Sequence, residues 1–308
     1  MNNTKEFIFI KSVKNGIPNR DSVTNEARFV ETENGVKIYL SPVSMQRDVR
    51  DYIIFEGEKE GQHIFVKESR DENGKLKTRK TLGYEIVSQL SGKNSKEIEK
   101  MNGEEIKEYL LKHCIDIRLF GISFTVKDQT FSLARAVSMD WAVNMHKVTP
   151  VNMSGTTVLP SDEGKGQGTG WSLQILPFAL FMATGDVNHF EAAENHTTEE
   201  DVDKFFRALW LGTKFRVGFG RGMQVPVFLL VIDYNEPEFK IGHLDDYLSV
   251  ENKEYERISD VTLLNKPLIK KLQKHKDKIN RIRLIYDDRL RIDEDFAKVG
   301  VPVEGVII

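Results

Sequence analysis

The stretch that decides the fold is residues 115–175, which contains IDIRLFGISFTV (115–126), FSLARAVSMDWAV (131–143) and GKGQGTG (164–170). Apolar residues recur at every second position of the first two segments, Arg118 and Arg135 interrupt the pattern, and Lys127 follows the first segment. Such alternation predicts strands with one buried and one solvated face, and the glycine-rich segment predicts a hairpin tip. An extended sheet surface that carries basic side chains suits a nucleic-acid strand better than a small buried substrate.

Composition narrows the class of protein. The chain has 308 residues, of which 40% are hydrophobic and 30% charged, so it can form one large domain or a core domain with sizeable insertions. Its single cysteine, Cys114, excludes an intramolecular disulfide and a cysteine-cluster metal site, and it predicts a reducing, cytoplasmic location. No stretch approaches the roughly 18 apolar residues that span a bilayer, and the N-terminal segment lacks the apolar core of a signal peptide. We therefore expect no membrane partner.

Charge is segregated along the chain, although the formal net charge is only −3. Residues 266–291 contain ten Lys and Arg against three Asp, whereas Glu191–Asp203 and Glu236–Asp260 are strongly acidic. Separate faces of opposite sign permit one face to bind a polyanion, and they also suit head-to-tail contact between copies. The alternative interpretation is a set of ordinary solvated helix faces.

The first part of the chain predicts a strand, a turn and a helix. Glu6–Val13 predicts a strand that ends at the turn Asn15–Asp21, and a short strand pattern follows at Val36–Leu40. The dipeptide Ser-Pro at residues 41–42 has the form of an N-cap followed by proline in the first turn, which predicts a helix to about Phe55.

The remainder of the chain alternates polar insertions with strongly apolar elements. Residues 56–113 are mostly polar and contain scattered glycines, which is typical of an insertion rather than of a core. The further predicted elements are short helices at Leu82–Leu90 and Ile106–Leu111, a charged hairpin or loop at Arg70–Lys80, a buried strand at Leu176–Val187, a helix capped by Thr197 or Thr198, and a strand at Val225–Tyr234.

Without its insertions, the chain reads strand, helix, two or more central strands, helix, strand. This order predicts an α+β protein with the split βαβ, or ferredoxin-like, fold. In that fold the helices cover one face of an antiparallel sheet and leave the other face free. RNA-recognition modules bind single strands on such a free face, so we expect an RRM-like sheet with insertions.

Five separate signals carry a resemblance to one family. They are Pro18–Asp21 after the first strand, Gln46–Tyr52 on the helix, Asp116–Gly121, the hairpin Lys165–Gly170, and Leu209–Lys214 before the last strand. Together and in this order they resemble the Cas7 backbone subunit of type I CRISPR effector complexes (Cascade), closest to the type I-B branch. This family belongs to the RAMP superfamily.

The resemblance implies a non-enzymatic, cofactor-free protein shaped like a right hand. The sheet would form the palm, residues 56–113 the fingers, residues 148–175 the thumb hairpin, and residues 235–308 a C-terminal extension. Its copies would polymerise along a CRISPR guide RNA (crRNA) into a helical filament and present the guide for pairing with target DNA. The implied partners are the crRNA, the target DNA, other copies, and the large, small and guide-end capping subunits.

Basic and polar residues at the predicted turn, helix and loops are the candidate RNA contacts. Gln46, Arg47 and Arg50 share one side of the helix, where exposed arginines would clamp successive phosphates. The full candidate set is Asn19, Arg20, Gln46, Arg47, Arg50, His146, Lys147, Met153, Trp171, Lys214, Arg216 and Arg221.

Several of these candidates have equally plain structural explanations. Met153 and Trp171 can stack on a base or pack into a core, and His146 can fill a core or a surface. We expect Trp141 and Trp210 to be core residues. Residues 215–222 depart from the family, in which a polar and basic stretch follows Gly-Thr-Lys, so the RNA contact of this loop stays open.

Two other classes of function are weighed against RNA binding. Subunits of the related type III complexes cut target RNA with an aspartate after the first strand, and Asp21 has a comparable position; loss of metal-dependent cleavage on Asp21→Ala would favour such an enzyme. A filament scaffold without nucleic acid rests on the segregated charges alone.

A nucleotide-binding glycine motif is excluded because no helix pattern follows residues 164–170, and the seven-residue spacing of His189 and His196 does not suit zinc.

Overall fold

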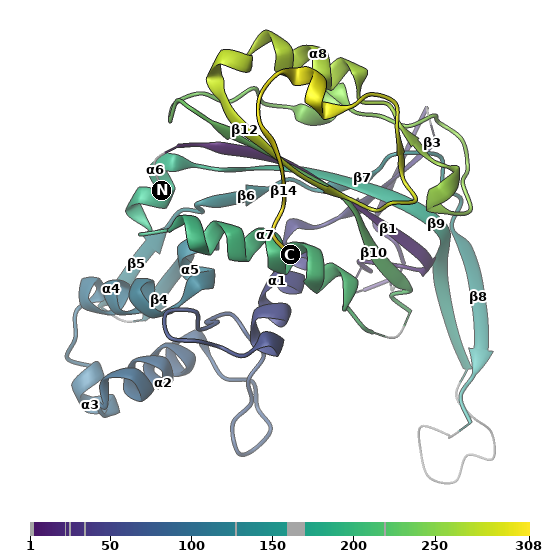
Figure 1. Cartoon of the computed structure of the whole chain (residues 1–308). Coiled ribbons are helices and arrows are strands. Elements are labelled where there is room, and N and C mark those ends of the chain that lie inside the picture. Colours follow the sequence, from purple (N-terminus) through teal and green to yellow (C-terminus); the bar gives the residue numbers. More distant parts are fainter. Residues whose placement is uncertain are drawn as a thin grey trace.

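The computed structural model describes residues 3–308, except residues 22, 25, 34, 127, 159–169 and 219. Its largest sheet contains β1 (Lys5–Gly16), β2 (Phe29–Thr32), β3 (Gly35–Leu40), β6 (Val137–Met139), β7 (Ala142–Asn144), β8 (Val151–Thr156), β9 (Gly170–Val187), β10 (Met223–Tyr234), β12 (Ile279–Tyr286) and β14 (Val303–Gly305). The order along the sheet is β14-β12-β10-β1-β9-β7-β3-β2, and β6 and β8 also pair with β9. The protein is therefore α+β, with a mostly antiparallel sheet through its middle (Figure 1).

The other elements lie around this sheet. The helices are α1 (Pro42–Glu56), α2 (Arg79–Ser91), α3 (Ser95–Ile98), α4 (Gly103–His113), α5 (Ile115–Phe120), α6 (His189–Glu194), α7 (Glu199–Lys214) and α8 (Lys266–Lys274). Two short strand pairs, β4 (Ile122–Val126) with β5 (Gln129–Leu133) and β11 (Thr262–Leu263) with β13 (Arg291–Ile292), form separate small sheets. Short 3-10 turns are at Leu244–Tyr247, Ile258–Asp260, Lys276–Lys278 and Phe296–Val299.

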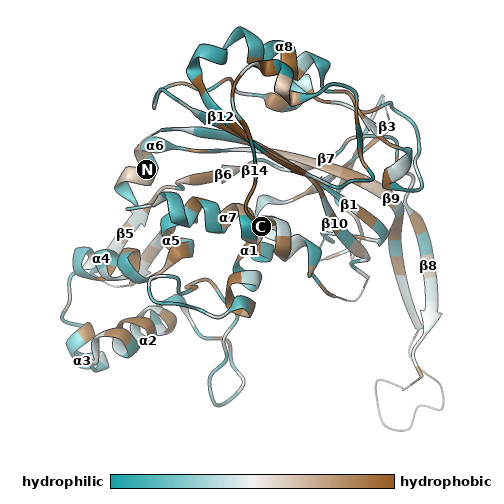
Figure 2. Ribbon diagram, viewed as in Figure 1, coloured by the Kyte–Doolittle hydropathy of each residue, from teal (hydrophilic) through white to brown (hydrophobic). Residues whose placement is uncertain are grey.

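Strand β1 lies between β9 and β10 at the centre of the sheet, and all three are hydrophobic. Phe7 of β1 faces Gly185 of β9, where a Cβ atom would lie 2.3 Å from the Phe7 ring. Glycine at this position lets the aromatic ring pack directly over the neighbouring strand. Figure 2 shows the hydrophobic residues concentrated in these central strands.

Helices α1 and α7 cover one face of the sheet, as the sequence predicts. Ser41 accepts a hydrogen bond from the Ser44 backbone N–H at the start of α1, and Thr198 forms a capping box with Asp201 at the start of α7. The aromatic residues Phe205 and Phe206 of α7 pack against Phe7 of the sheet with ring centroids 5.7 and 5.3 Å apart. Trp210 is buried in this core, as predicted.

The opposite face of the sheet is covered, so the predicted free face is wrong. Within residues 235–308, β12 and β14 extend the sheet, and much of the rest packs over this face with α8 outermost (Figure 1). Leu268 and Leu272 of α8 are buried in a second core with Phe228 and Ile232 of β10. Burial of this much apolar surface stabilises the fold and leaves the face closed to an RNA strand.

The segment Ile115–Phe120 is helix α5, so the predicted strand there is wrong. All six of its residues are buried, including Asp116 and Arg118. The pattern of alternating polar residues therefore reflects two buried ion pairs rather than a solvated strand face. The prediction is correct at β4, which forms an antiparallel hairpin with β5. The strand predicted at Phe131–Val143 is instead divided among the end of β5, β6 and β7.

Residues 56–113 form a helical lobe below the sheet in Figure 1, with the predicted helices present as α2 and α4. Its own core, around Val87, Ile106 and Leu110, includes Phe124 of the β4–β5 hairpin. Strands β8 and β9 form the long hairpin predicted for residues 148–175, and its glycine-rich tip lies outside the described residues. None of the helices in the described part of the chain is long and apolar enough to cross a membrane.

Candidate nucleic-acid interface

Five arginines from four separate segments line one cavity of about 600 Å³, which we call the arginine groove. It is lined by Asn19, Arg28, Ser41, Pro42, Val43, Ser44, Gln46, Arg47, Arg135, Trp141, Arg216 and Arg221. None of these lining residues is an Asp or Glu. Guanidinium groups recognise phosphate oxygens with two parallel hydrogen bonds, so the groove has the chemistry of a phosphate site.

The N-terminus of α1 forms part of the groove. Ser41, Pro42 and Ser44 line it at the first turn of this 15-residue helix. Aligned peptide dipoles leave partial positive charge at a helix N-terminus, which favours anions there. The helix dipole therefore acts in the same direction as the arginines.

A buried ion-pair chain holds Arg216 in place. The Arg216 guanidinium is paired with Asp48 of α1, and Asp48 in turn accepts a hydrogen bond from Lys11 Nζ of β1 at 3.4 Å. Lys11 also donates to Gln224 Oε1 at 3.0 Å, and burial lowers the pKa of Lys11. Sheet, helix and loop are thus joined beneath the groove, so Arg216 is preorganised rather than free to rotate.

Close backbone approaches at two glycine positions bring together α1, α7 with its following loop, and the turn after β1. At Gly212 of α7 a Cβ atom would lie 2.2 Å from the Asp48 carbonyl oxygen, so only glycine lets α7 pack this closely on α1. At Gly16 a Cβ atom would lie 2.2 Å from the backbone nitrogen of Gly222, and the Ile17 N–H donates to the Gly220 carbonyl at 2.9 Å. The loop after α7 is therefore held against the turn after β1.

Two hydrogen-bond donors of the groove have no acceptor among the described residues. Arg221 donates from Nη1 to the Pro18 carbonyl at 3.0 Å, and burial together with neighbouring Arg216 lowers the pKa of Arg221. Among the described residues, Asn19 Nδ2 and Arg28 Nε are buried without a hydrogen-bond acceptor. The carboxylate paired with Arg28, that of Asp21, is 3.8 Å away. Buried unsatisfied donors are costly, and an anion in the groove would satisfy them.

Comparison with known proteins identifies the family. The sequence model of the family described as CRISPR-associated protein Cas7 matches residues 3–266. The chain belongs to the Cas7 family. A CRISPR-associated protein Cas7 of Haloferax volcanii is 22% identical over 318 residues, which cover 94% of this chain and 89% of the relative.

Two solved structures share the fold of this Cas7 chain. A chain described as a CRISPR RNA-guided surveillance complex, pre-nicking, superposes with a TM-score of 0.58 at 14% identity and covers 96% of this chain and 98% of its own. A second, described as a CRISPR RNA-guided surveillance complex, has a TM-score of 0.51 at 13% identity and covers 96% and 97%. The similarity extends over nearly the whole chain.

Five residues that the sequence singles out line the groove of this Cas7 protein: Asn19, Gln46, Arg47, Arg216 and Arg221. Arg20 lies close enough to Arg221 to contribute to lowering the pKa of Arg221. The predicted turn, helix and loop therefore do meet in space. Their role in RNA binding stays a prediction.

The exposure predicted for Arg50 is wrong. Its Nε donates to Asp116 at 3.0 Å, its guanidinium lies 4.8 Å from the centre of the Phe120 ring, and its side chain is buried. Asp116 also accepts hydrogen bonds from the backbone N–H groups of Phe65 and Val66. Arg50 thus joins α1 to α5 and the lobe, while Arg47, on the same helix, is exposed and paired with Asp51.

His146 is a core residue and not part of an open groove. Its Nδ1–H donates to the Lys147 carbonyl at 2.8 Å, while its Nε2 accepts from the Leu180 N–H at 3.1 Å. Burial lowers the pKa of His146, which favours this neutral form. Lys147 and Lys214 are exposed, but neither is among the residues that line the groove.

Trp141, rather than the candidate Trp171, is the tryptophan that lines the groove. The ring of Trp171 lies across the strand pair from Gly155, where a Cβ atom would be 2.5 Å away, so this ring packs on its own hairpin. Met153 on the neighbouring strand is half exposed. Trp141, by contrast, is 47% exposed at the edge of the groove, so its predicted place in the core is wrong.

Arg28, Arg135 and Trp141 are the basic and aromatic residues of the groove that the sequence did not single out as sites. Each stands beside a short strand, Arg28 before β2 and the other two around β6. Their one available signal was basic or aromatic character next to a strand end, which many surface residues share. Only the fold brings them to the N-terminus of α1.

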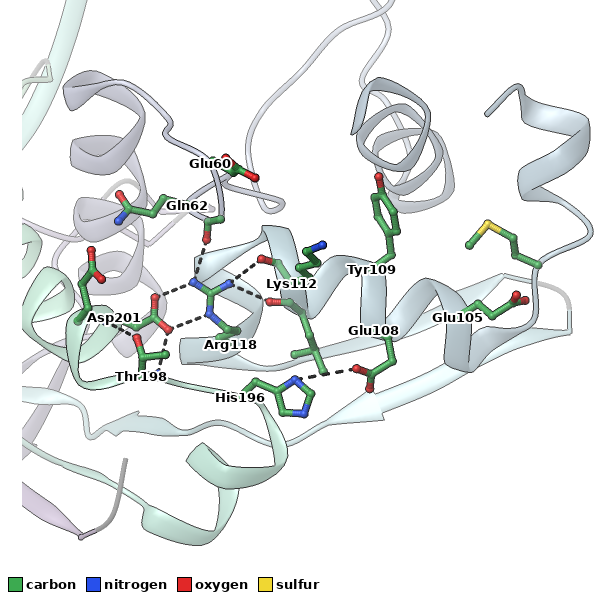
Figure 3. Close-up of a pocket in the computed structure, with 14 residues that line it drawn as sticks. Glu60, Gln62, Glu105, Glu108, Tyr109, Lys112, Arg118, His196, Thr198 and Asp201 are labelled. Carbon is green, nitrogen blue, oxygen red and sulfur yellow. Dashed lines mark hydrogen bonds and ion pairs between the residues drawn. The ribbon is translucent and has the colours of Figure 1, made fainter. Parts of the chain in front are cut away.

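A second, larger cavity of about 830 Å³ lies between α4, the N-terminus of α7 and residues 60–62. Figure 3 shows that its arginine, Arg118, is already engaged: it forms two hydrogen bonds with Asp201 and others with backbone carbonyls. Glu105 and Glu108 add negative charge at its rim. Among residues with a described position, no cluster of His, Cys, Asp and Glu is suited to a metal ion.

Proposed function

We propose that this chain is a backbone subunit of a CRISPR RNA-guided surveillance complex and binds the crRNA through the arginine groove. The observation that carries the proposal is the convergence of five arginines and a helix N-terminus in one cavity without a lining carboxylate. Membership of the Cas7 family, and the fold shared with chains of such complexes, support it. Arg47 and Arg135 are exposed, where phosphates can reach them, while Arg216 and Arg221 are held in fixed positions.

The central strands support a ferredoxin-like palm. Strands β10, β1, β9 and β7 lie side by side and antiparallel, and α1 and α7 are in the sequence positions of the two helices of a split βαβ repeat. On this basis the helical lobe of residues 56–113 is the fingers, the β8–β9 hairpin the thumb, and residues 235–308 an extension that closes the second face of the palm. RNA then follows the edge of the palm rather than its face.

The same proposal sets the wider role of the protein. Copies polymerise along the crRNA and present its bases to target DNA in the cytoplasm, in a type I complex of the I-B branch, together with large, small and capping subunits. We propose that the subunit itself is non-enzymatic. Asp21 supports this because its Oδ1 accepts hydrogen bonds from the Val23 and Thr24 backbone N–H groups, which lower the pKa of Asp21 and give it a structural task.

The test is RNA that copurifies when the protein is expressed with a CRISPR array. Arg47→Glu with Arg135→Glu places two carboxylates in the groove at exposed positions, so we expect the 260 to 280 nm absorbance ratio to fall to that of free protein. The matched control is Lys270→Glu with Lys274→Glu on exposed positions of α8, which makes the same change in net charge. It should keep RNA that ribonuclease removes.

The opposite pattern of results would overturn the proposal. If the α8 variant loses RNA while the groove variant keeps it, the polyanion site is the basic segment 266–291. The structure favours the groove, because three arginines of that segment are already paired: Arg281 and Arg283 with Asp233, and Arg289 with Asp287. Circular dichroism of both variants would show that neither has lost its fold.

A further inference from the structure

An apolar cavity adjoins the arginine groove on the side of the β2–β3 hairpin. We call it the aromatic pocket; it is lined by Asp21, Thr24, Glu26, Ala27, Arg28, Phe29, Val30, Tyr39 and Trp141 and has a volume of about 600 Å³. Arg28 and Trp141 line both cavities. A chain segment in the groove therefore reaches the aromatic pocket without crossing another part of the surface.

The side chains of the aromatic pocket are unusual for an exposed edge. Phe29, Val30 and Trp141 are 42%, 54% and 47% exposed, so their apolar surfaces form one continuous patch with Tyr39. The rings of Tyr39 and Trp141 meet edge to face, with centroids 6.5 Å apart. An exposed apolar patch of this kind marks a binding surface.

The walls of the aromatic pocket are held by backbone hydrogen bonds. The Asp21 N–H donates to the Glu26 carbonyl at 2.8 Å, and the Tyr39 N–H donates to the Arg28 carbonyl at 2.8 Å. The Ala27 N–H donates to the Gln174 side chain at 3.1 Å, which attaches the loop to β9. The pocket is thus a built feature of the fold.

We propose that the aromatic pocket binds one nucleobase of the strand whose phosphates lie in the arginine groove. This inference rests on the proposed function. A flat base stacks on an exposed aromatic ring, and the adjoining arginines supply the sites for the phosphates on either side of it. The Glu26 carboxylate, which also lines the pocket, accepts a hydrogen bond from an exocyclic amino group of the base.

The pocket is a better match to a base than to a peptide side chain. The pocket combines apolar rings with the exposed Glu26 carboxylate, and a base presents an apolar face and a polar edge together, as a purely apolar partner does not. The excess positive charge of the groove, which joins the pocket through Arg28, further favours an anionic polymer.

The experiment compares two strands of equal length and phosphate number. One is an unstructured single-stranded RNA that contains all four bases, and the other is an abasic ribose-phosphate strand. Affinity of the full-length protein for each is measured by fluorescence anisotropy for the native chain, Trp141→Ala and Trp141→Phe. Phe190→Ala, an exposed aromatic residue of α6, is the matched control.

We expect Trp141→Ala to weaken binding of the RNA by about 5- to 150-fold, from roughly 1 to 3 kcal/mol per stacked base at about 1.4 kcal/mol per tenfold. Its binding of the abasic strand should be unchanged, and Trp141→Phe should recover most of the RNA affinity. If Trp141→Ala weakens binding of both strands equally, or of neither, the inference about the base is wrong. The proposal that the arginine groove binds phosphates is not affected by that result. A loss of self-association without a loss of RNA affinity would overturn the inference about the base in favour of a second copy as occupant. If the native chain binds neither strand, the proposed function itself fails.

Discussion

The arginine groove and the Arg118 cavity in Figure 3 both contain guanidinium groups, but they differ in what those groups already bind. Arg118 donates to Asp201 and to the carbonyls of Gly61 and Leu111, which leaves it no capacity for a ligand. In the groove, Arg28 Nε and Asn19 Nδ2 lack acceptors among the described residues. The presence of hydrogen-bond donors without acceptors, rather than of arginines or a large cavity, is what distinguishes the candidate nucleic-acid site from the Arg118 cavity.

The two cavities lie at opposite ends of α7. Asp201, which pairs with Arg118, is in its first turn, and Gly212, which contacts α1 below the groove, is in its last. One helix therefore supports a structural ion pair at one end and a candidate binding site at the other. Substitutions at the two ends should separate stability from RNA binding.

The largest effect is expected from Arg118→Met. Removing one partner of a buried ion pair leaves Asp201 charged and uncompensated, which costs about 3 to 5 kcal/mol of unfolding free energy. Urea denaturation followed by tryptophan fluorescence measures this change. RNA affinity of the remaining folded protein should stay at the native value.

The matched control for this prediction is Arg47→Met in the groove. Its guanidinium is exposed and forms an ion pair with Asp51 at 3.3 Å, which is worth at most about 1 kcal/mol. We expect a small change in stability and a clear loss of RNA affinity. If Arg118→Met weakens RNA binding as much as Arg47→Met does, the two cavities do not separate stability from RNA binding.

The sequence predicted those parts of the fold whose signals are local. The caps at Ser41 and Thr198 and the apolar runs of β1 and β10 depend on neighbouring residues, and the structure has them where predicted. The segment Ile115–Phe120 was assigned wrongly because six alternating residues fit a strand or a buried helix equally well. What decides between them is Arg50 and Asp201, far away along the chain, which pair with Asp116 and Arg118.

Among the candidate site residues too, some could be predicted from local signals and others depend on contacts with distant parts of the chain. Arg47, Arg216 and Arg221 were found from local features, namely a helix side and glycine-flanked positions. Exposure of Arg50 was predicted wrongly because its burial depends on a partner in α5. The place of His146 stayed open in the sequence because its burial depends on a partner in β9. The closed second face of the sheet is also a long-range property, since it needs residues 235–308 to pack on β10.

An intermediate effect is expected from Gly212→Ala at the groove end of α7. The added methyl group would lie 2.2 Å from the Asp48 carbonyl, so α7 must move away from α1. Overpacking of this kind costs about 1 to 3 kcal/mol. Because Asp48 orients Arg216, RNA affinity should fall as well, in contrast to Arg118→Met at the other end of the helix.

Gly305→Ala is the control for the added methyl group, because no atom lies within 4 Å of the position of its Cβ. Its unfolding free energy and RNA affinity should remain near the native values. Denaturation and anisotropy on the same samples provide both readouts. Native RNA affinity in Gly212→Ala would show that the groove does not depend on the α1–α7 contact.

The smallest effect is expected from His146. Like that of Arg118, its side chain is buried and hydrogen-bonded to other groups of the protein. Its pKa is lowered by burial, whereas in the unfolded chain it is about 6.5, so below that pH the unfolded state binds the extra proton. Stability should therefore fall as the pH drops below about 6.5, by at most roughly 1.4 kcal/mol per pH unit for one histidine. His146→Gln should flatten this slope in denaturation measured from pH 7.5 to 5, while the pH dependence of RNA affinity should match that of the native chain. If His146 instead contacts phosphate, RNA affinity should rise as the pH falls, and His146→Gln should abolish that rise. The variant should then leave the pH dependence of the unfolding free energy unchanged.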